Sequence, residues 1–279
     1  MPSTDSHSAA PDTRAVVGLD DAPPPGYIAL CWEVFFRSRG RGVAMDAHFP
    51  WLHVPGQAVF VTLRVDDAVI AGCAMRFIDD RTRARRGAAI GLVCVDAKHR
   101  GQGHSSRVLE RAIAHADALG LADLVLWTGK PGVYERHGFA LDDDGLYGSA
   151  CAPAGMAPLA VDATQDAWPG SGDTRGLPPF AASGERWQSA DASAIVVRDA
   201  RGPILAEWQG PDAAVADLLA HAMPPAWRIN ALAGDGLPAL LAERGFALDL
   251  QPSRLRMRRP APLAGAAPRR YDLRVLDRI

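Results

Sequence analysis

Apolar residues in the first half of the chain follow two alternating spacings. Short runs rich in β-branched residues, typical of buried strands, occur at residues 13–19, 58–65, 69–77, 88–95, 121–127 and 139–146. Apolar side chains recur at helical spacing in residues 26–37 and 107–118, and residues 129–137 can form a short helix. Asp66-Asp67 marks a hairpin between two strands, whereas helices connect the later ones. The pattern predicts an α/β (α+β) fold with a mixed sheet flanked by helices.

A second patterned region follows a change in composition. Residues 152–185 are rich in Pro, Gly, Ala, Ser and Asp and show little periodicity, which indicates a linker. Beyond it we expect a hairpin, a helix, a strand, a further helix and a strand that ends near Met257. The pentapeptide Gly-Phe-Ala-Leu-Asp occurs at 138–142 and again at 245–249, each time after a strand and a short helix. This recurrence suggests a duplication, although chance agreement of five residues is the alternative.

These patterns divide the chain into five expected parts. They are a flexible start at 1–12, a first domain at 13–151, the linker at 152–185, a smaller and shortened repeat at 186–260, and a tail at 261–279. Residues 37–55 interleave aromatic, acidic and imidazole groups without a clear period. We expect that segment either to line a pocket or to cap the core.

Composition and charge favour a globular protein and exclude several classes. Of the 279 residues, 48% are hydrophobic and 22% charged, which argues against overall disorder. The formal net charge of −2 and the pI near 6.4 lack the basic balance of a nucleic-acid-binding protein. Two arginine-rich stretches, at 81–86 and 254–278, are interpreted as solvated surface.

The cysteines and the apolar runs bear on metal sites and location. The four cysteines are widely spaced and form no pattern suited to zinc, so we expect no metal site. Cys73 and Cys94 lie in predicted strands, where they would pack as small apolar groups. Reduced cysteines favour the cytoplasm. No apolar run approaches the roughly 20 residues of a membrane span, and the start lacks the layout of a signal peptide.

One strand–turn–helix combination suggests an anion site. The strand at 88–95 leads through a polar turn into Arg100-Gly101-Gln102-Gly103-His104-Ser105-Ser106, where the next helix begins. The first N–H groups of a helix have no partner within the helix, and the helix dipole places partial positive charge there. Two glycines allow the backbone close to a phosphate, and Arg100 adds a positive charge. We therefore predict that this turn cradles a phosphate group.

This turn, together with residues 129–139, resembles the GNAT superfamily of acyl-CoA-dependent N-acetyltransferases. The family's pattern Arg/Gln-x-x-Gly-x-Gly/Ala after a core strand is matched by residues 100–105, with Ser105 at the small final position and His104 where an aliphatic residue is usual. The family's Tyr-x-x-x-Gly-Phe is matched by residues 134–139. The resemblance covers about residues 13–149. It implies a mixed, mostly antiparallel twisted sheet flanked by helices, and the second region is similar to the degenerate half of tandem members.

The resemblance also implies a reaction and a set of residues. An acetyl group would pass from acetyl-CoA (coenzyme A) to a primary amine of a small molecule or amino sugar by direct attack in a ternary complex. Tyr134 matches the tyrosine that protonates the departing thiolate. The cofactor would be bound by Val93, Val95, Arg100, Gly101, Gln102, Gly103, His104, Ser105 and Ser106. The expected partner is thus a small-molecule amine rather than nucleic acid or membrane, and a homodimer is left open.

The general base cannot be assigned from the sequence. The core strand contains no Glu, and the candidates before the hairpin are Glu33, Asp46, His48 and His53. This gap keeps a second hypothesis open, in which the protein is a catalytically inactive acyl-CoA-binding regulatory or interaction module. A structural protein without a cofactor is the third hypothesis.

Overall fold

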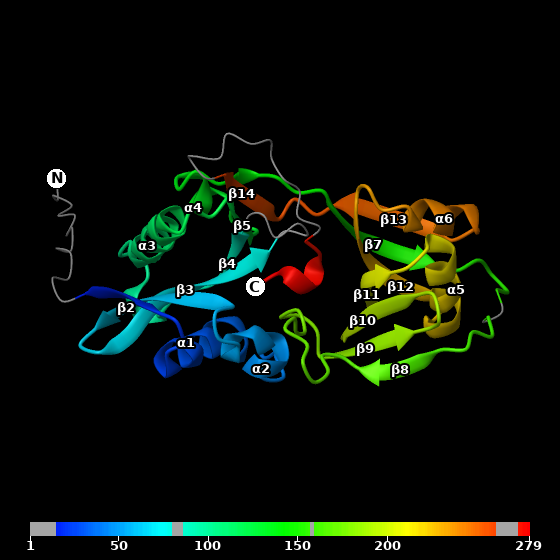
Figure 1. Ribbon diagram of the computed structural model, residues 1–279, viewed down its shortest axis with the longest axis horizontal. Helices are drawn as coiled ribbons and strands as arrows, with labels where there is room; N and C mark the ends of the chain where they lie inside the picture. The colour runs from blue at the N-terminus through cyan, green and yellow to red at the C-terminus, as the bar shows by residue number, and fades with distance from the viewer. Residues whose placement is uncertain (1–14, 80–85, 157–158, 261–272) are drawn as a thin grey trace, which may run out of the picture.

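In the part of the chain that the structure describes, the strands form two sheets of seven strands each, which lie side by side (Figure 1). The computed structural model describes residues 15–79, 86–156, 159–260 and 273–279. The first sheet has the order β1-β2-β3-β4-β5-β14-β6. Its strands are β1 (Val16–Asp20), β2 (Ala58–Val65), β3 (Ala68–Asp79), β4 (Arg86–Val95), β5 (Asp123–Trp127), β6 (Ala140–Leu141) and β14 (Arg256–Pro260). Only β4 and β5 pair in parallel, so the sheet is mixed and mostly antiparallel, as predicted.

Helices cover both faces of the first sheet. The apolar stripe of α3 (His104–Ala118) packs on one face through Val108, Leu109 and Ala112. On the other face lies α1 (Pro25–Phe35), which begins at a proline and buries Tyr27, Leu30 and Cys31. The short α4 (Gly132–Glu135) follows β5. Cys73 and Cys94 are buried thiols, as expected from their strands.

Residues 37–55 cap the core beside α1. They form three short helices, η1 (Arg37–Arg39), α2 (Met45–His48) and η2 (Pro50–His53). Phe49 and Trp51 are almost fully buried, with ring centroids 5.9 Å apart, and Trp51 stacks on Phe60 of β2. The segment fulfils both expected roles, since Phe49 and Trp51 cap the core and Arg39 lines a cavity beside β4.

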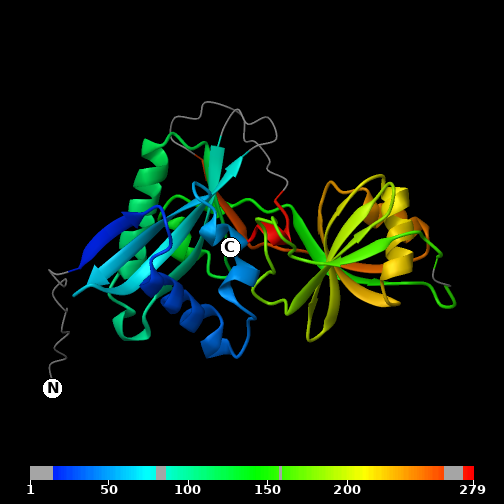
Figure 2. The same ribbon diagram turned by 60° about the horizontal axis from the view of Figure 1, so that its bottom comes forward.

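The second sheet has the order β13-β7-β12-β11-β10-β9-β8. Its strands are β7 (Gly145–Cys151), β8 (Thr164–Ala167), β9 (Ser183–Gln188), β10 (Ser193–Asp199), β11 (Gly202–Gln209), β12 (Ala226–Leu232) and β13 (Ala247–Pro252). Its outer face is covered by α5 (Asp212–Ala222) and α6 (Leu237–Glu243) (Figure 2). The other face packs against Trp168 and Leu177 and against η4 (Val275–Asp277).

The two halves exchange a strand. After β6 the chain crosses to the second sheet as β7, and after β13 it crosses back as β14 (Figure 1). Residues 140–151 and 247–258 pair antiparallel with one constant register, from Ala140 opposite Arg258 to Cys151 opposite Ala247. The single strands expected at 139–146 and up to Met257 are therefore each divided between two sheets. The sheets do not follow the domain boundaries expected from the sequence, because β7 belongs to the second sheet and β14 to the first. Strand β8 lies within residues 152–185, which were expected to form a linker.

The arginine-rich stretch that follows β13 corrects the sequence interpretation. Arg256 and Arg258 are largely buried, and their guanidinium groups pair with Asp144 at 2.8 Å and with Asp123 at 2.5 Å. Arg259 pairs with Asp117 at 3.0 Å. These side chains do not face solvent. Because a buried guanidinium needs a carboxylate partner, their ion pairs hold β14 in the first sheet. The other basic run lies outside the described residues, apart from Arg86 at the start of β4.

Asp143 holds the crossing point together. Its carboxylate accepts backbone N–H groups from Leu255 at 2.7 Å, Arg256 at 3.1 Å and Gly145 at 2.9 Å. Partial burial opposes ionisation of this carboxyl, but the N–H donors outweigh it and hold the pKa of Asp143 below its ordinary value. One side chain thus joins both crossing strands.

Replacement of Asp143 by Ala should lower the free energy of unfolding by about 2–3 kcal/mol at pH 7, because three N–H groups lose their acceptor. The pKa of Asp143 is lowered by folding, so its stabilisation is present above the unfolded value of about 3.9 and is lost as the pH falls through the folded value. Urea unfolding at pH 7 and pH 3 should therefore show a difference that shrinks in acid. The exposed neighbour Asp142→Ala serves as control, and an equal loss in both variants would contradict the assignment.

Candidate active site

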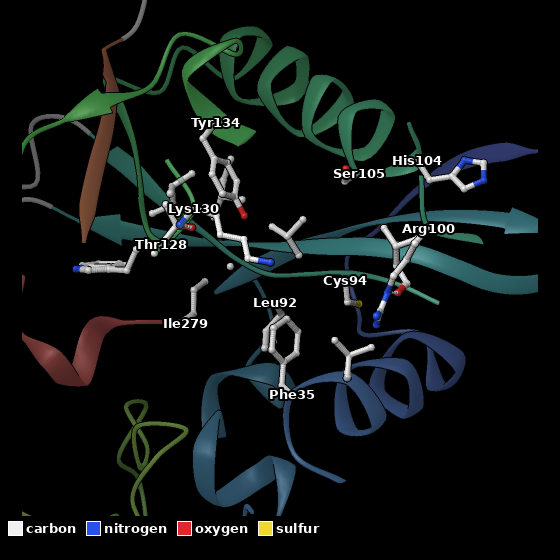
Figure 3. A pocket seen from close by; sticks show the side chains of 18 of the residues that line it. Phe35, Leu92, Cys94, Arg100, His104, Ser105, Thr128, Lys130, Tyr134 and Ile279 are labelled. Carbon is white, nitrogen blue, oxygen red and sulfur yellow. Dashed lines mark hydrogen bonds between the residues drawn. The ribbon is translucent and has the colours of Figure 1, made fainter. Parts of the chain in front are cut away.

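A cavity opens where β4 and β5 separate. The two strands pair only at Ala88 with Leu124 and at Ala89 with Val125, near the start of each strand. Beyond these positions the strands diverge, and a cavity of about 780 Å³ lies between residues 90–95 of β4 and residues 126–130. Figure 3 shows side chains from both strands, α1, α4 and the start of α3 converging on it.

A bulge in β4 produces this separation. The register with β3 shifts between Gly72 and Ala74, and Leu92 has a φ of +50°, which is rare for a residue with a branched side chain. The fully buried Tyr27 hydroxyl donates a hydrogen bond of 2.9 Å to the Leu92 carbonyl. Burial raises the pKa of Tyr27 well above its ordinary value, so the hydroxyl keeps its proton. Gly72 makes room for the ring, since a Cβ there would lie 2.7 Å from it.

The start of α3 forms an open cradle at one end of the cavity. Gly101 and Gly103 have φ values of +80° and +79°, and Gly103 is the residue that precedes the helix. A Cβ on either glycine would meet no atom within 4 Å, so the space above them can hold a ligand. Within the described residues no side chain caps this helix start. The positive end of the helix dipole lies at the cavity, because Gly103, His104 and Ser105 at the helix start line it.

Arg100 and His104 frame the cradle. The Arg100 side chain is exposed, and its Nε donates to the Val95 carbonyl at 3.3 Å, which holds the guanidinium beside the end of β4. His104 is buried at the first turn of α3, and its Nε2 lies 3.2 Å from the Gln102 Oε1. The histidine therefore fits the helix packing at this position.

Tyr134 projects from α4 into the middle of the cavity (Figure 3). Its ring packs against the core and meets Phe139 edge-on, with 6.3 Å between the ring centroids. Burial is the main reason that the pKa of Tyr134 is raised, and the nearby Cys73 acts in the same direction. The phenol therefore carries its proton at neutral pH and can act as a proton donor.

Most of the residues predicted for the site face one cavity. Its lining includes Val93, Val95, Arg100, Gly101, Gly103, His104, Ser105 and Tyr134. Two predicted residues do not line it: Gln102 contacts His104, and Ser106 donates its backbone N–H to the Gly103 carbonyl in the first turn of α3. The roles of all ten residues in cofactor binding or catalysis stay predictions.

The four candidate bases lie elsewhere. Glu33 is exposed and pairs with Arg37 at 3.3 Å, and His53 pairs with Asp46 at 2.8 Å on the surface. His48 is buried, where its ring stacks on Phe36 and its Nδ1 lies 3.0 Å from the Leu177 carbonyl. Among the described residues, no Asp or Glu side chain lines the cavity, whereas Arg39, Arg100 and Lys130 do. The described lining of the site thus contains positive charge and no carboxylate side chain.

Sequence reasoning missed several residues of the site. Tyr27 and Phe35 of α1, Lys130 after β5 and Ile279 come from three separate segments, and no motif connects them. One signal was present, because Gly72 lies inside a predicted strand, and a glycine there often marks a bulge or a close approach of another chain segment. Ile279 is separated from the rest of the site by more than a hundred residues, so only the fold reveals it.

Comparison with known proteins finds a family match within the first half of the chain. Residues 27–139 match the acetyltransferase (GNAT) family. No curated protein matches the chain. Solved structures with the GNAT fold match nearly the whole of it, including both sheets.

Three of these structures illustrate the likeness. A probable N-acyltransferase of unknown function from Enterococcus faecalis V583 has a TM-score of 0.65 and 13% identity over 90% of this chain and 74% of its own. A GCN5-related N-acetyltransferase from Kribbella flavida has a TM-score of 0.60 and 15% identity over 88% of this chain and 71% of its own. A GCN5-related N-acetyltransferase from Anabaena variabilis ATCC 29413 has a TM-score of 0.61 and 11% identity over 88% of this chain and 73% of its own. At these identities the likeness establishes the fold.

The part of the chain that the structure describes contains neither a membrane-spanning helix nor a metal-binding cluster. No helix there has the length and apolar character to cross a membrane. No cluster of three or more His, Cys, Asp or Glu side chains is arranged to hold a metal ion.

His48 should act in stability rather than chemistry. Its Nε2 accepts the Val43 N–H at 3.1 Å, and its Nδ1 lies 3.0 Å from the Leu177 carbonyl. Burial lowers the pKa of His48, so its stabilisation is full above the unfolded value of about 6.5 and is lost as the pH falls through the folded value. His48→Gln should cost about 1–2 kcal/mol at pH 8 and flatten the fall in stability between pH 8 and pH 5. Denaturant unfolding across this range measures both effects, and an unchanged pH dependence would disprove the role.

Proposed function

We propose that the protein transfers an acetyl group from acetyl-CoA to a primary amine of a small molecule or amino sugar, by direct attack in a ternary complex. The observation that carries the proposal is the placement of the glycine cradle and Tyr134 on one cavity between β4 and β5. When bound, acetyl-CoA supplies an acetyl group that is activated as a thioester. The protein has to bind this molecule, orient it and provide a proton.

The cradle suits the pyrophosphate of coenzyme A. Backbone N–H groups at the start of α3 would hold the phosphate oxygens, with Arg100 adding positive charge. The open space above Gly101 and Gly103 is what a bulky phosphate requires. Residues 92 and 93 are released from the β3 ladder by the bulge, so the main chain around Val93 can bind the amides of the pantetheine arm.

Tyr134 would give its proton to the sulfur atom as the thiolate leaves. The raised pKa keeps the phenol protonated at neutral pH, which is the state required of an acid. No carboxylate side chain lines the cavity in the described residues, so we infer that the amine loses its proton to water before or during attack. The amine would then react in its neutral form.

We also infer that the second half is a degenerate repeat of the first. The order β11-α5-β12-α6-β13 repeats the order β4-α3-β5-α4-β6, with one parallel pair in each half. The helix α5 begins after Gly210-Pro211 rather than after a two-glycine cradle. Leu241, which aligns with Tyr134, is fully buried in the core. One active site, in the first half, is therefore proposed.

Gly103→Ala should weaken coenzyme A binding at least tenfold. A side chain at this position would enter the space proposed for the phosphate, and the positive φ would strain the turn. Gly120→Ala at the other end of α3 is the matched control, since Gly120 also has a positive φ and open space around it. Titration calorimetry should show a loss in the first variant alone. Equal affinity in both would reject the cradle.

Tyr134→Phe should lower kcat about 100-fold with little change in coenzyme A affinity, because it removes only the proton donor. Release of free thiol from acetyl-CoA in the presence of a panel of amines measures turnover. Tyr147→Phe, on the exposed surface of β7, is the control and should leave turnover unchanged. Full activity of Tyr134→Phe would refute the assignment of the acid.

No carboxylate side chain of the described residues lines the cavity, which favours one alternative, a catalytically inactive acyl-CoA-binding module. Such a protein would bind coenzyme A in the same cradle and interact with a partner. It would show tight binding by calorimetry and no thiol release with any amine. The Tyr134→Phe variant would then behave like the wild type in both assays.

A further inference from the structure

The segment 273–279 lies between the two sheets and is anchored on the second half (Figure 1). Val275 and Leu276 are buried in the core on the inner face of that sheet. The Arg274 guanidinium makes two contacts of 2.9 Å with the Asp235 carboxylate and lies 4.4 Å from the ring centroid of Trp208. Paired contacts of this kind fix the direction in which the segment leaves the anchor.

The anchored segment delivers Ile279 to the first sheet. Ile279 lies directly on Gly91 of β4, where a Cβ would come within 2.3 Å of the Ile279 carbonyl oxygen and 2.4 Å of its side chain. Its side chain packs with the cores that contain Leu92 and Val125. It also lines the cavity, on the side opposite Arg100 and His104 and on the same side as Tyr134 (Figure 3).

The cavity therefore has an open end and a closed end. At the open end is the cradle, beyond the last residue of β4. At the closed end β4 and β5 come together at Ala89 and Val125, and the wall consists of Ile90, Gly91 and Leu126. A thioester that enters from the cradle and passes Tyr134 points its acyl chain toward this closed end. The residue that occupies the space there limits the length of the chain.

We propose that Ile279 sets the longest acyl group that the site accepts. This inference rests on the proposed binding of acyl-CoA in the same cavity. The glycine at position 91 allows the main chain of residue 279 to come close, and the branched Ile side chain then fills the end of the cavity. The second half of the molecule would thus contribute a specificity residue to a site built mainly by the first half.

Ile279→Ala removes three carbon atoms from the end of the cavity and should admit about three further methylene groups. Calorimetric titration with acetyl-, butyryl- and hexanoyl-CoA, in the absence of any amine, measures the effect without knowledge of the acceptor. Each newly buried methylene strengthens binding about fourfold. The ratio of hexanoyl-CoA to acetyl-CoA affinity should therefore rise at least tenfold over the wild type. Ile279→Val, which is safer for folding, should give a smaller rise in the same direction.

Ile28→Ala is the matched control, since Ile28 packs on the same core as Ile279 and does not line the cavity. It should keep the wild-type ratio. Acyl-CoA binding with an unchanged ratio in both Ile279 variants would overturn the role of Ile279 and leave the proposed function standing. Failure of the wild type to bind any acyl-CoA would overturn the proposed function, and the inference with it.

Discussion

The hydrogen bond from Tyr27 to the Leu92 carbonyl is the contact on which the site depends. It connects α1 to the bulge of β4 inside the core, where no water can replace it. The bulge places Leu92 in a left-handed conformation and releases two residues of β4 from the β3 ladder. Because β4 then bends away from β5, the sheet opens at its middle and the cavity can form. Tyr27 and Gly72 are thus part of the site even though neither faces the cavity.

The exchanged strands place a second constraint on the molecule. Without β14, strand β5 would lose its antiparallel neighbour and β6 its partner, so the first sheet is completed by residues from the other half. In the second sheet, β12 and β13 would lose their shared neighbour without β7, which follows directly on the first half of the chain. Asp143 and Arg256 fix the crossing in one register. The two halves therefore depend on each other for folding, and the segment 273–279 extends that dependence to the cavity.

Much of this could be predicted from the sequence where the signal is local. Apolar spacing located the elements of the first sheet, and the glycine turn with Tyr134 located one wall of the cavity. The crossing was missed because residues 139–146 form a plausible single strand, and pairing partners a hundred residues away decide which sheet it joins. The buried arginines were missed for a similar reason. Arg258 looks solvated until β14 is placed beside Asp123.

The comparison of the two halves shows that topology alone does not make a site. Among the described strands, each half has one parallel pair with two paired positions. Leu92 in β4 and Trp208 in β11 both lie three residues beyond the last paired position. Leu92 lies at the bulge of β4. Trp208 is buried, and the Arg274 guanidinium lies over its indole ring. Arg274 belongs to the segment 273–279, which also contains Ile279. The position used in one half to open a cavity is used in the other to anchor the chain that closes it. The second half thus holds the anchor of a segment that reaches the cavity of the first half.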